Sequence, residues 1–155
     1  MFTHNELHMS APSQRCFEVA ADVERWPEIL PHYRWVRFHR RDGFGSGLVE
    51  MAARRMFGPL PYPVWWVSEM DSDGEQPVVR YRHVDGVTRG MVVEWRFHTD
   101  EEAGGTRVEI THSWPQGATW PLIGRFAADA VIGPVFIHHV AGRTLEGVKR
   151  KAEAE

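Results

Sequence analysis

The sequence predicts an α+β fold, in which a curved antiparallel sheet of about seven strands wraps around one long C-terminal helix. The clearest strand lies within residues 88–98, where every second side chain is large and apolar: Met91, Val93, Trp95 and Phe97. Further apolar runs separated by turn residues continue to about residue 114, and beyond residue 117 the apolar spacing changes to three and four. A sheet and a helix of this kind bury their apolar faces against each other.

The first part of the chain predicts one strand and two short helices. The strand is expected over residues 3–9, and a helix over 12–21 follows a serine that can cap it and a proline that suits its first turn. A second short helix is expected over 23–30. Pro27 and Pro31 bound it, because proline is tolerated at a helix start but not in its interior.

Six antiparallel strands are expected between Tyr33 and about Trp114, because turn signals divide this segment into short runs. The turn signals are Asp42-Gly43, Gly58-Pro59, Asp73-Gly74, Asp85-Gly86 and Gly104-Gly105. The run from Gly58 to Pro63 is rich in proline and could be a rigid loop at a pocket mouth or a plain connection. Together with the first strand, the six strands give the predicted sheet.

The last part of the chain predicts one long amphipathic helix. Apolar residues recur at helical spacing from Ile123 to Val148, Gly133-Pro134 is expected to interrupt or kink the helix, and a Lys-Arg-Lys run ends it. If the sheet is strongly curved, the helix cannot contact it everywhere. A cavity is then expected between them, and apolar cavities with a few polar groups are typical ligand sites.

Size and charge exclude several classes of protein. A chain of 155 residues, 43% of them apolar, is expected to form one domain over residues 1–155. Its 18 basic and 21 acidic residues give a net charge of -3, and the basic residues are spread along the chain, so no nucleic-acid partner is expected. The absence of a long apolar stretch and of a basic, then apolar N-terminus predicts a cytoplasmic protein with no membrane span.

The sequence shows no pattern for a metal or a cofactor. Cys16 is the single cysteine, which excludes an internal disulfide and a zinc site of several thiolates and fits a reducing cytoplasm. The neighbouring His138 and His139 cannot form an i,i+4 metal-binding pair on a helix, and no glycine-rich phosphate loop links a strand to a helix. We expect neither a metal nor a cofactor.

Four segments, in this order along the chain, resemble the START-like helix-grip (SRPBCC) superfamily, and within it the bacterial polyketide aromatase/cyclases of the polyketide cyclase/dehydrase family. The segments are 23–33 (VERWPEILPHY), 64–69 (VWWVSE), 91–97 (MVVEWRF) and 143–145 (RTL). The resemblance covers nearly the whole chain and implies a helix-grip fold. Because the superfamily also includes lipid-transfer and quinone-binding proteins, the fold alone does not choose an activity.

The resemblance implies a pocket for antibiotic biosynthesis, in which a poly-β-ketone chain on an acyl carrier protein folds for aldol cyclisation and aromatisation. It places the pocket on a set of aromatic and polar positions: Trp26, Tyr33, Trp66, Ser68, Met91, Trp95 and the last helix near His139. Strand alternation adds Met70, Tyr81 and Val93 to the same lining. The protein is expected to be a monomer or a homodimer.

Two positions depart from the aromatase/cyclase pattern. Where the family has an arginine two residues after the serine, this chain has Met70, and a second arginine position appears as His83. A developing enolate needs a preorganised cation or hydrogen-bond donor, and a thioether supplies neither. Ordinary aromatase chemistry therefore requires other groups in this chain.

Several polar side chains that strand alternation places on the inward face could take the role of the missing arginines. Histidine suits acid-base work near neutral pH, so His83 or His112 is a candidate to remove an acidic proton between two ketones. Tyr33, Ser68 or Arg55 would then hydrogen-bond the enolate oxygen, provided that the strand carrying Arg55 has no bulge. Each group also has a plainer interpretation: a lone histidine on a strand is more often structural, and Arg55 could equally reach solvent.

Three functions stay open at this point. The first is a polyketide cyclase or dehydratase. The second is a non-catalytic carrier of a lipid, quinone or other hydrophobic ligand, which Met70 favours because a pocket without a fixed cation polarises its guest poorly. The third is an interaction protein whose cavity is filled by its own side chains. At least two polar groups converging on one cavity point would favour catalysis.

Overall fold

The computed structural model describes residues 1–57, 59–117 and 134–154. Seven strands and several helices follow one another in the predicted order. They are β1 (Phe2–Met9), α1 (Ser13–Ala21), η1 (Val23–Arg25), α2 (Trp26–Ile29), β2 (Tyr33–Gly43), β3 (Ser46–Phe57), β4 (Leu60–Asp73), β5 (Val78–Gly86), β6 (Val92–Thr99), β7 (Thr106–Ser113) and α4 (Pro134–Glu153).

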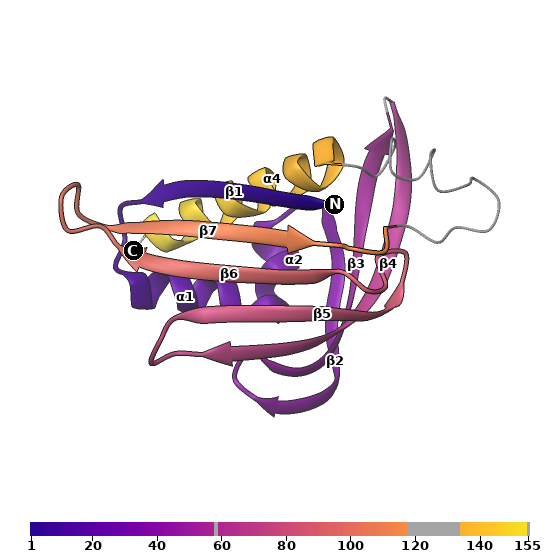
Figure 1. Cartoon of the computed structure of the whole chain (residues 1–155), viewed down its shortest axis with the longest axis horizontal. Coiled ribbons are helices and arrows are strands. Elements are labelled where there is room, and N and C mark those ends of the chain that lie inside the picture. Colours follow the sequence, from indigo (N-terminus) through magenta and orange to yellow (C-terminus); the bar gives the residue numbers. More distant parts are fainter. Residues whose placement is uncertain (58, 118–133, 155) are drawn as a thin grey trace.

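The strands form one antiparallel sheet in the order β1-β7-β6-β5-β4-β3-β2. Consecutive strands from β2 to β7 are neighbours, and β1 pairs with β7 from Phe2 opposite Ser113 to Met9 opposite Thr106. Figure 1 shows β3 and β4 turning away from the direction of β6 and β7, so the sheet is strongly curved. The register shifts between β2 and β3 and between β4 and β5 are irregularities of the kind that bend a sheet. The predicted curved, seven-stranded helix-grip sheet is confirmed.

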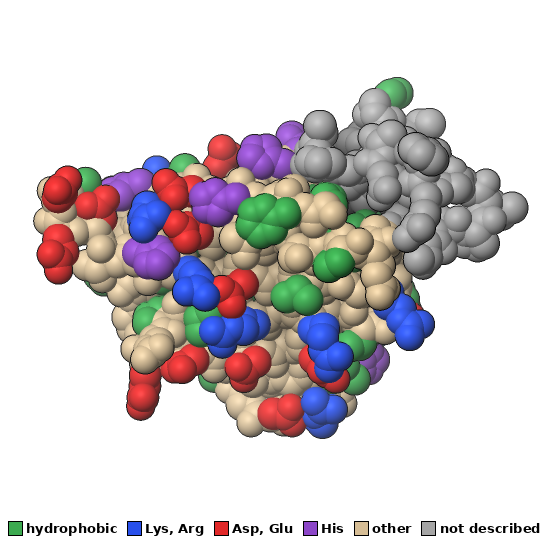
Figure 2. Space-filling model, in the orientation of Figure 1, with side chains coloured by type: hydrophobic (Ala, Val, Ile, Leu, Met, Phe, Trp, Pro, Cys, Tyr) green, Lys and Arg blue, Asp and Glu red, His purple; other side chains and the backbone are tan. Residues whose placement is uncertain are grey.

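The two faces of the sheet differ as the alternation predicts. On β6 the inward side chains Val93, Trp95 and Phe97 are buried, whereas Val92 and Arg96 are exposed. The outer face of β1 and β5–β7 carries intermixed charged side chains and histidines (Figure 2), joined by ion pairs such as Arg80–Glu94 at 2.8 Å. Exposed pairs of this kind each contribute about 0–1 kcal/mol, so they keep the face soluble more than they stabilise it.

Helix α4 packs against the concave side through a stripe at helical spacing: Ile137, Ala141, Leu145, Val148 and Ala152. It lies close to the end of α2. A Cβ at Gly147 would lie 2.1 Å from Leu30 Cδ2, so a larger residue there would require the Leu30 side chain to move. Helix α1 covers the other part of the concave side, where it contacts α4, β5, β6 and β7.

Some predicted boundaries need correction. The expected helix over 23–30 is split into the 3-10 turn η1 and the short helix α2, with a proline in the first turn of α2. Most of the proline-rich run near residue 60 belongs to a strand and not to a loop, because β4 begins at Leu60 and pairs with β3 as far as Met70. The helical pattern expected before residue 134 lies outside the described residues, and the Lys-Arg-Lys run forms part of the last turns of α4. Among the described helices, none is long and apolar enough to cross a membrane.

Candidate functional site

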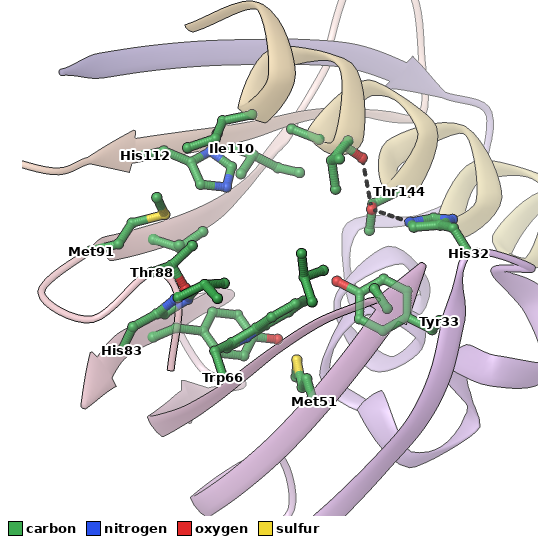
Figure 3. A pocket seen from close by; sticks show the side chains of 18 of the residues that line it. His32, Tyr33, Met51, Trp66, His83, Thr88, Met91, Ile110, His112 and Thr144 are labelled. Atoms are coloured by element: carbon green, nitrogen blue, oxygen red, sulfur yellow. Dashed lines mark hydrogen bonds between the residues drawn. The ribbon is translucent and has the colours of Figure 1, made fainter. Parts of the chain in front are cut away.

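A cavity of about 120 Å³ lies between the concave face of the sheet and α4. Figure 3 shows its lining from close by. Most of the described lining is apolar or aromatic: Trp26, Met51, Ala53, Val64, Trp66, Val87, Met91, Val93, Trp95, Ile110, Ile137, Val140 and Ala141. The polar part of the lining is His32, Tyr33, Arg54, Tyr81, His83, Thr88, His112 and Thr144. An apolar space with a few polar groups is the usual form of a small-molecule site.

A chain of aromatic rings joins α2 to the sheet on one side of the cavity. Trp26 meets Tyr33 edge-on with ring centroids 5.1 Å apart, and Tyr33 meets Trp66 edge-on at 6.1 Å. Trp26 also lies 5.9 Å from Trp95 of β6. Edge-to-face contacts are favoured by the ring quadrupole, so these rings hold each other in place. The result is a preformed aromatic wall.

His83 and His112 lie on the opposite side of the cavity from Tyr33 (Figure 3). Their strands, β5 and β7, both neighbour β6: the His83 amide donates to the Met91 carbonyl at 2.9 Å, and His112 lies opposite Val93. The His83 Nδ1 lies 2.5 Å from the Thr88 hydroxyl, and the Trp66 ring stacks on the imidazole at 5.8 Å. Within the described residues, His112 Nδ1 has no hydrogen-bond partner.

Both imidazoles are neutral at physiological pH. Burial, with a smaller contribution from the neighbouring His112, lowers the pKa of His83 to about 3. Burial also lowers the pKa of His112 to about 4. A neutral imidazole has one nitrogen that can accept a proton and one that can donate a hydrogen bond. The pair can therefore act on a ligand as base and as donor.

The turn between β5 and β6 places Thr88 over His83. Gly86 has φ +91°, and a Cβ there would lie 2.3 Å from the Trp65 carbonyl oxygen, so the turn requires glycine. The Gly90 amide donates to the His83 carbonyl at 2.9 Å, which ties the far end of the turn back to β5. The Thr88 hydroxyl is held in this way and fixes the orientation of the His83 ring.

Tyrosine and threonine form the other polar end of the cavity. Burial raises the pKa of Tyr33, which the nearby Thr144 hydroxyl partly offsets. Burial also raises the pKa of Tyr81 well above its ordinary value, and Tyr33 adds to this effect. Thr144 donates its hydroxyl proton to the Val140 carbonyl at 2.9 Å and lies 3.3 Å from His32 Nε2. Because their pKa values are raised, Tyr33 and Tyr81 are neutral phenols that can donate a hydrogen bond. The Tyr81 hydroxyl has no partner among the described residues.

Nine of the residues predicted from the sequence line the cavity: Trp26, Tyr33, Trp66, Tyr81, His83, Met91, Val93, Trp95 and His112. Three are placed elsewhere. Ser68 and Met70 face inward and are buried, but they lie nearer the end of β4 that α1 covers and are not among the described lining residues. His139 is exposed, because the face of α4 that borders the cavity is made by Ile137, Val140, Ala141 and Thr144.

Arg54 lines the cavity in the region where Arg55 was expected. Ala52 and Ala53 are both buried, so burial does not alternate strictly there, and the register shift between the pairs Tyr33–Ala53 and Trp35–Ala52 leaves its extra residue in β2. The side chain of Arg55 lies outside the described part of the structure. Three more polar lining residues were missed because they lie in turns or on the long helix: His32, Thr88 and Thr144.

Among the residues that the structure describes, one group of side chains could hold a metal ion, but it lies outside the cavity. His4, Glu6 and Glu109 bring their ligand atoms within 4.8 Å of one another on the outer face of β1 and β7. Arg107 already occupies both carboxylates, at 3.1 Å from Glu6 and 2.5 Å from Glu109. This cluster is part of the ion-paired outer surface.

Comparisons with known proteins agree with this architecture. A family model for polyketide cyclase / dehydrase and lipid transport matches residues 9–132. A curated Streptomyces cyaneus protein, named as a candidate polyketide cyclase, is 31% identical over 127 residues, which is 77% of this chain and 76% of that protein.

Two solved structures share the fold over almost the whole chain. The Zhui aromatase/cyclase of Streptomyces sp. R1128 is 25% identical with a TM-score of 0.78, and the match covers 99% of this chain and 93% of that one. A protein of Thermus thermophilus is 21% identical with a TM-score of 0.82, and the match covers 99% of this chain and 98% of that one.

The fold and the enclosed cavity define a START-like helix-grip protein, as the sequence resemblance implied. The chain belongs to the polyketide cyclase/dehydrase and lipid transport family.

Proposed function

We propose that the protein binds a poly-β-ketone or an aromatic polyketide in its cavity and promotes aldol cyclisation and dehydration. The observation that carries the proposal is the pair of neutral, buried histidines, His83 and His112, at one end of a mostly apolar cavity. Two polar side chains that converge in this way are more than a passive container needs. Membership of the family supports a cyclase-like role, and the similarity to an aromatase/cyclase agrees with it.

The first step is removal of a proton from a carbon between two ketones. Thr88 holds Nδ1 of His83, which leaves Nε2 to accept that proton, while the electron pair of the C–H bond becomes an enolate. The neutral His112 imidazole, which lies on the same side of the cavity as His83, would then donate a hydrogen bond to the enolate oxygen. A pKa near 3 makes the free imidazole a weak base, but the enolate that forms beside it stabilises the imidazolium.

The enolate carbon then attacks a second ketone of the same chain. A carbon–carbon bond forms, and the resulting alkoxide takes the proton from the imidazolium, so the base is regenerated. Loss of water follows. The regenerated imidazole removes the remaining acidic α-proton, and the new hydroxyl group leaves as water with a proton from the imidazolium. No oxidant is consumed.

The size of the cavity limits the part of the ligand that it encloses. A cavity of about 150 Å³ holds one benzene molecule, so the present volume of about 120 Å³ is close to one aromatic ring. The flexible side chains of Met51 and Met91 line it, and methionines adjust readily to a larger guest. We expect ligand binding to move these two side chains, with the rest of the polyketide extending through the opening.

Product analysis tests the proposal. A synthetic poly-β-ketone is incubated with the protein, and the cyclised products are compared with those that form spontaneously. Substitution of both histidines, H83N/H112N, should return the product ratio to the spontaneous one while thermal melting still shows a folded protein. H98N is the matched control, since His98 lies on the outer face of β6. An unchanged ratio in the double variant would contradict the proposal.

Carriage of a hydrophobic ligand is the second candidate. The mostly apolar lining favours it, and the family description includes lipid transport. Met70 stands at the expected arginine position but lies off the cavity, so no cation reaches the ligand from that part of β4. A wild-type protein that binds aromatic ligands but leaves the spontaneous product ratio unchanged would favour carriage.

A further inference from the structure

Four basic residues come from the segments that meet at the tyrosine end of the cavity, and we call them the basic rim: His32, Arg54, His139 and Arg143. His32 and Arg54 line the cavity, and their backbones are held side by side because the Arg54 amide donates to the His32 carbonyl at 2.7 Å. Figure 3 shows His32 against Thr144, across the cavity from His83.

The other two members of the basic rim come from α4. Arg143 directly precedes Thr144, whose hydroxyl lies 3.3 Å from His32 Nε2, and His139 is four residues earlier on the same exposed side of the helix. The pKa of His32 agrees with this placement. Burial is the largest cause that lowers it to about 4, and the nearby Arg143 and His139 lower it further. The rim is therefore a locally positive site in a chain of net charge -3.

The two arginines of the rim differ from most others in lacking a carboxylate. In the described part of the chain, eight arginines form ion pairs with Asp or Glu: Arg25, Arg37, Arg40, Arg41, Arg80, Arg82, Arg96 and Arg107. Neither Arg54 nor Arg143 forms one with a described residue. An exposed guanidinium beside an apolar cavity, with a fork of donors that no described carboxylate occupies, matches the geometry of a carboxylate or a phosphate.

We propose that the basic rim binds an anionic group, a carboxylate or a phosphate, on the ligand whose apolar part occupies the cavity. This inference rests on the proposed function and adds the orientation of the ligand. An anion at the rim directs the rest of the ligand past Trp66 toward His83 and His112, because the rim and the histidines lie at opposite ends of the lining. The anion could belong to the free end of a released chain or to a phosphate ester that carries the chain.

Three naphthalene probes of one size test the rim by calorimetry: 1-naphthamide, 1-naphthoate and 1-naphthyl phosphate. The wild-type protein should bind both anions more tightly than the neutral amide. In R54Q/R143Q the two anions should bind about tenfold more weakly, which is the usual size of a lost charge-assisted contact, while the amide changes less than about twofold. Near neutral pH the phosphate carries up to two negative charges and the carboxylate one, so a larger loss for the phosphate is expected from charge alone. A loss confined to the phosphate would identify a phosphate ester as the natural anion, and a loss confined to the carboxylate would identify a carboxylate.

R150Q is the matched control. Arg150 lies seven residues beyond Arg143 on the same helix, is exposed, and has no carboxylate partner among the described residues. Its substitution removes the same charge and should leave all three affinities unchanged.

The experiment separates two failures. If naphthamide binds the wild-type protein but R54Q/R143Q weakens the anions no more than the amide, or no more than R150Q does, the rim inference is wrong and the proposed function stands. If none of the three probes binds the wild-type protein, the cavity is not a ligand site and both proposals fail.

Discussion

The same alternation of apolar and polar side chains runs along both halves of the concave face of the sheet, but only one half encloses a cavity. In the half that α1 covers, Phe17 packs edge-on against Phe97 at 5.9 Å, and Met9, Val79 and Val108 are completely buried. In the other half, no residue of α1 lines the cavity. Among the described residues, α4 and Trp26 of α2 face the sheet there, and space is left beside Trp66. Alternation therefore decides which side chains face inward, and the covering helix decides whether they pack or line a site.

Both halves contain buried polar groups. In the half that α1 covers, Thr106 donates to the Ala11 carbonyl at 2.7 Å, but the buried Ser68 hydroxyl has no partner among the described residues. The cavity half leaves the Tyr81 hydroxyl and His112 Nδ1 without partners among the described residues. Buried polar atoms are rarely left unpaired unless a ligand or water completes them, so this half has the character of a binding site.

The largest expected effect is a difference in stability between two methionines, one in each half. Met9 lies in the packed half and Met91 lines the cavity. M9A should lower the free energy of unfolding by about 4 kcal/mol because it creates a new void, whereas M91A should cost about 2 kcal/mol because it extends an existing space. Urea unfolding at neutral pH measures both values. Equal losses would mean that the halves are packed alike.

An acid-dependent loss of stability should come from the cavity half. The unfolded chain binds protons on histidine below about pH 6.5, whereas folded His83 and His112 do so only near pH 3 and 4. Stability is therefore complete above pH 6.5 and falls as the pH drops. The free energy of unfolding should fall by about 1–2 kcal/mol for each of the two histidines between pH 6.5 and 5. Carboxylates contribute little to the change in this pH range.

Urea unfolding at pH 7.5 and pH 5 measures this loss. H83N/H112N should show a smaller loss than the wild-type protein, although His32, with a pKa lowered to about 4, still contributes. H98N again serves as the control on the outer face. The same pH dependence in the double variant and the wild type would show that the two histidines are not buried as neutral groups.

The smallest expected effect on stability concerns Thr88, a positioning residue for His83. T88V keeps the shape of the side chain but removes the hydroxyl that lies 2.5 Å from Nδ1, at a cost of about 1 kcal/mol in stability. Cyclisation should fall about tenfold, and T88S should restore it. Imidazole ¹⁵N shifts of His83 report the tautomer directly. A valine variant with the wild-type tautomer and rate would remove Thr88 from the mechanism.

The sequence could predict the strand order and most of the lining, because alternation and turn signals are local. It could not predict how far along each strand the cavity extends. Ser68 and Met70 have the correct parity, but they lie nearer the half that α1 fills, and only the docking of α1 determines that. Arg54 lines the cavity although strand alternation places it on the other face from Met51 and Ala53, so parity could not predict it, and the side chain of the expected Arg55 lies outside the described part of the structure. Thr88 lies in a turn, where no periodicity applies.

Native mass spectrometry of the protein purified from its own host tests the central claim most directly, because it identifies the molecule that the cavity half holds. The account predicts a bound polyketide or an aromatic compound derived from one, which is lost from the H83N/H112N variant or replaced there by an uncyclised chain. A fatty acid bound equally by the wild type and the double variant would contradict the cyclase-like role and establish the protein as a carrier.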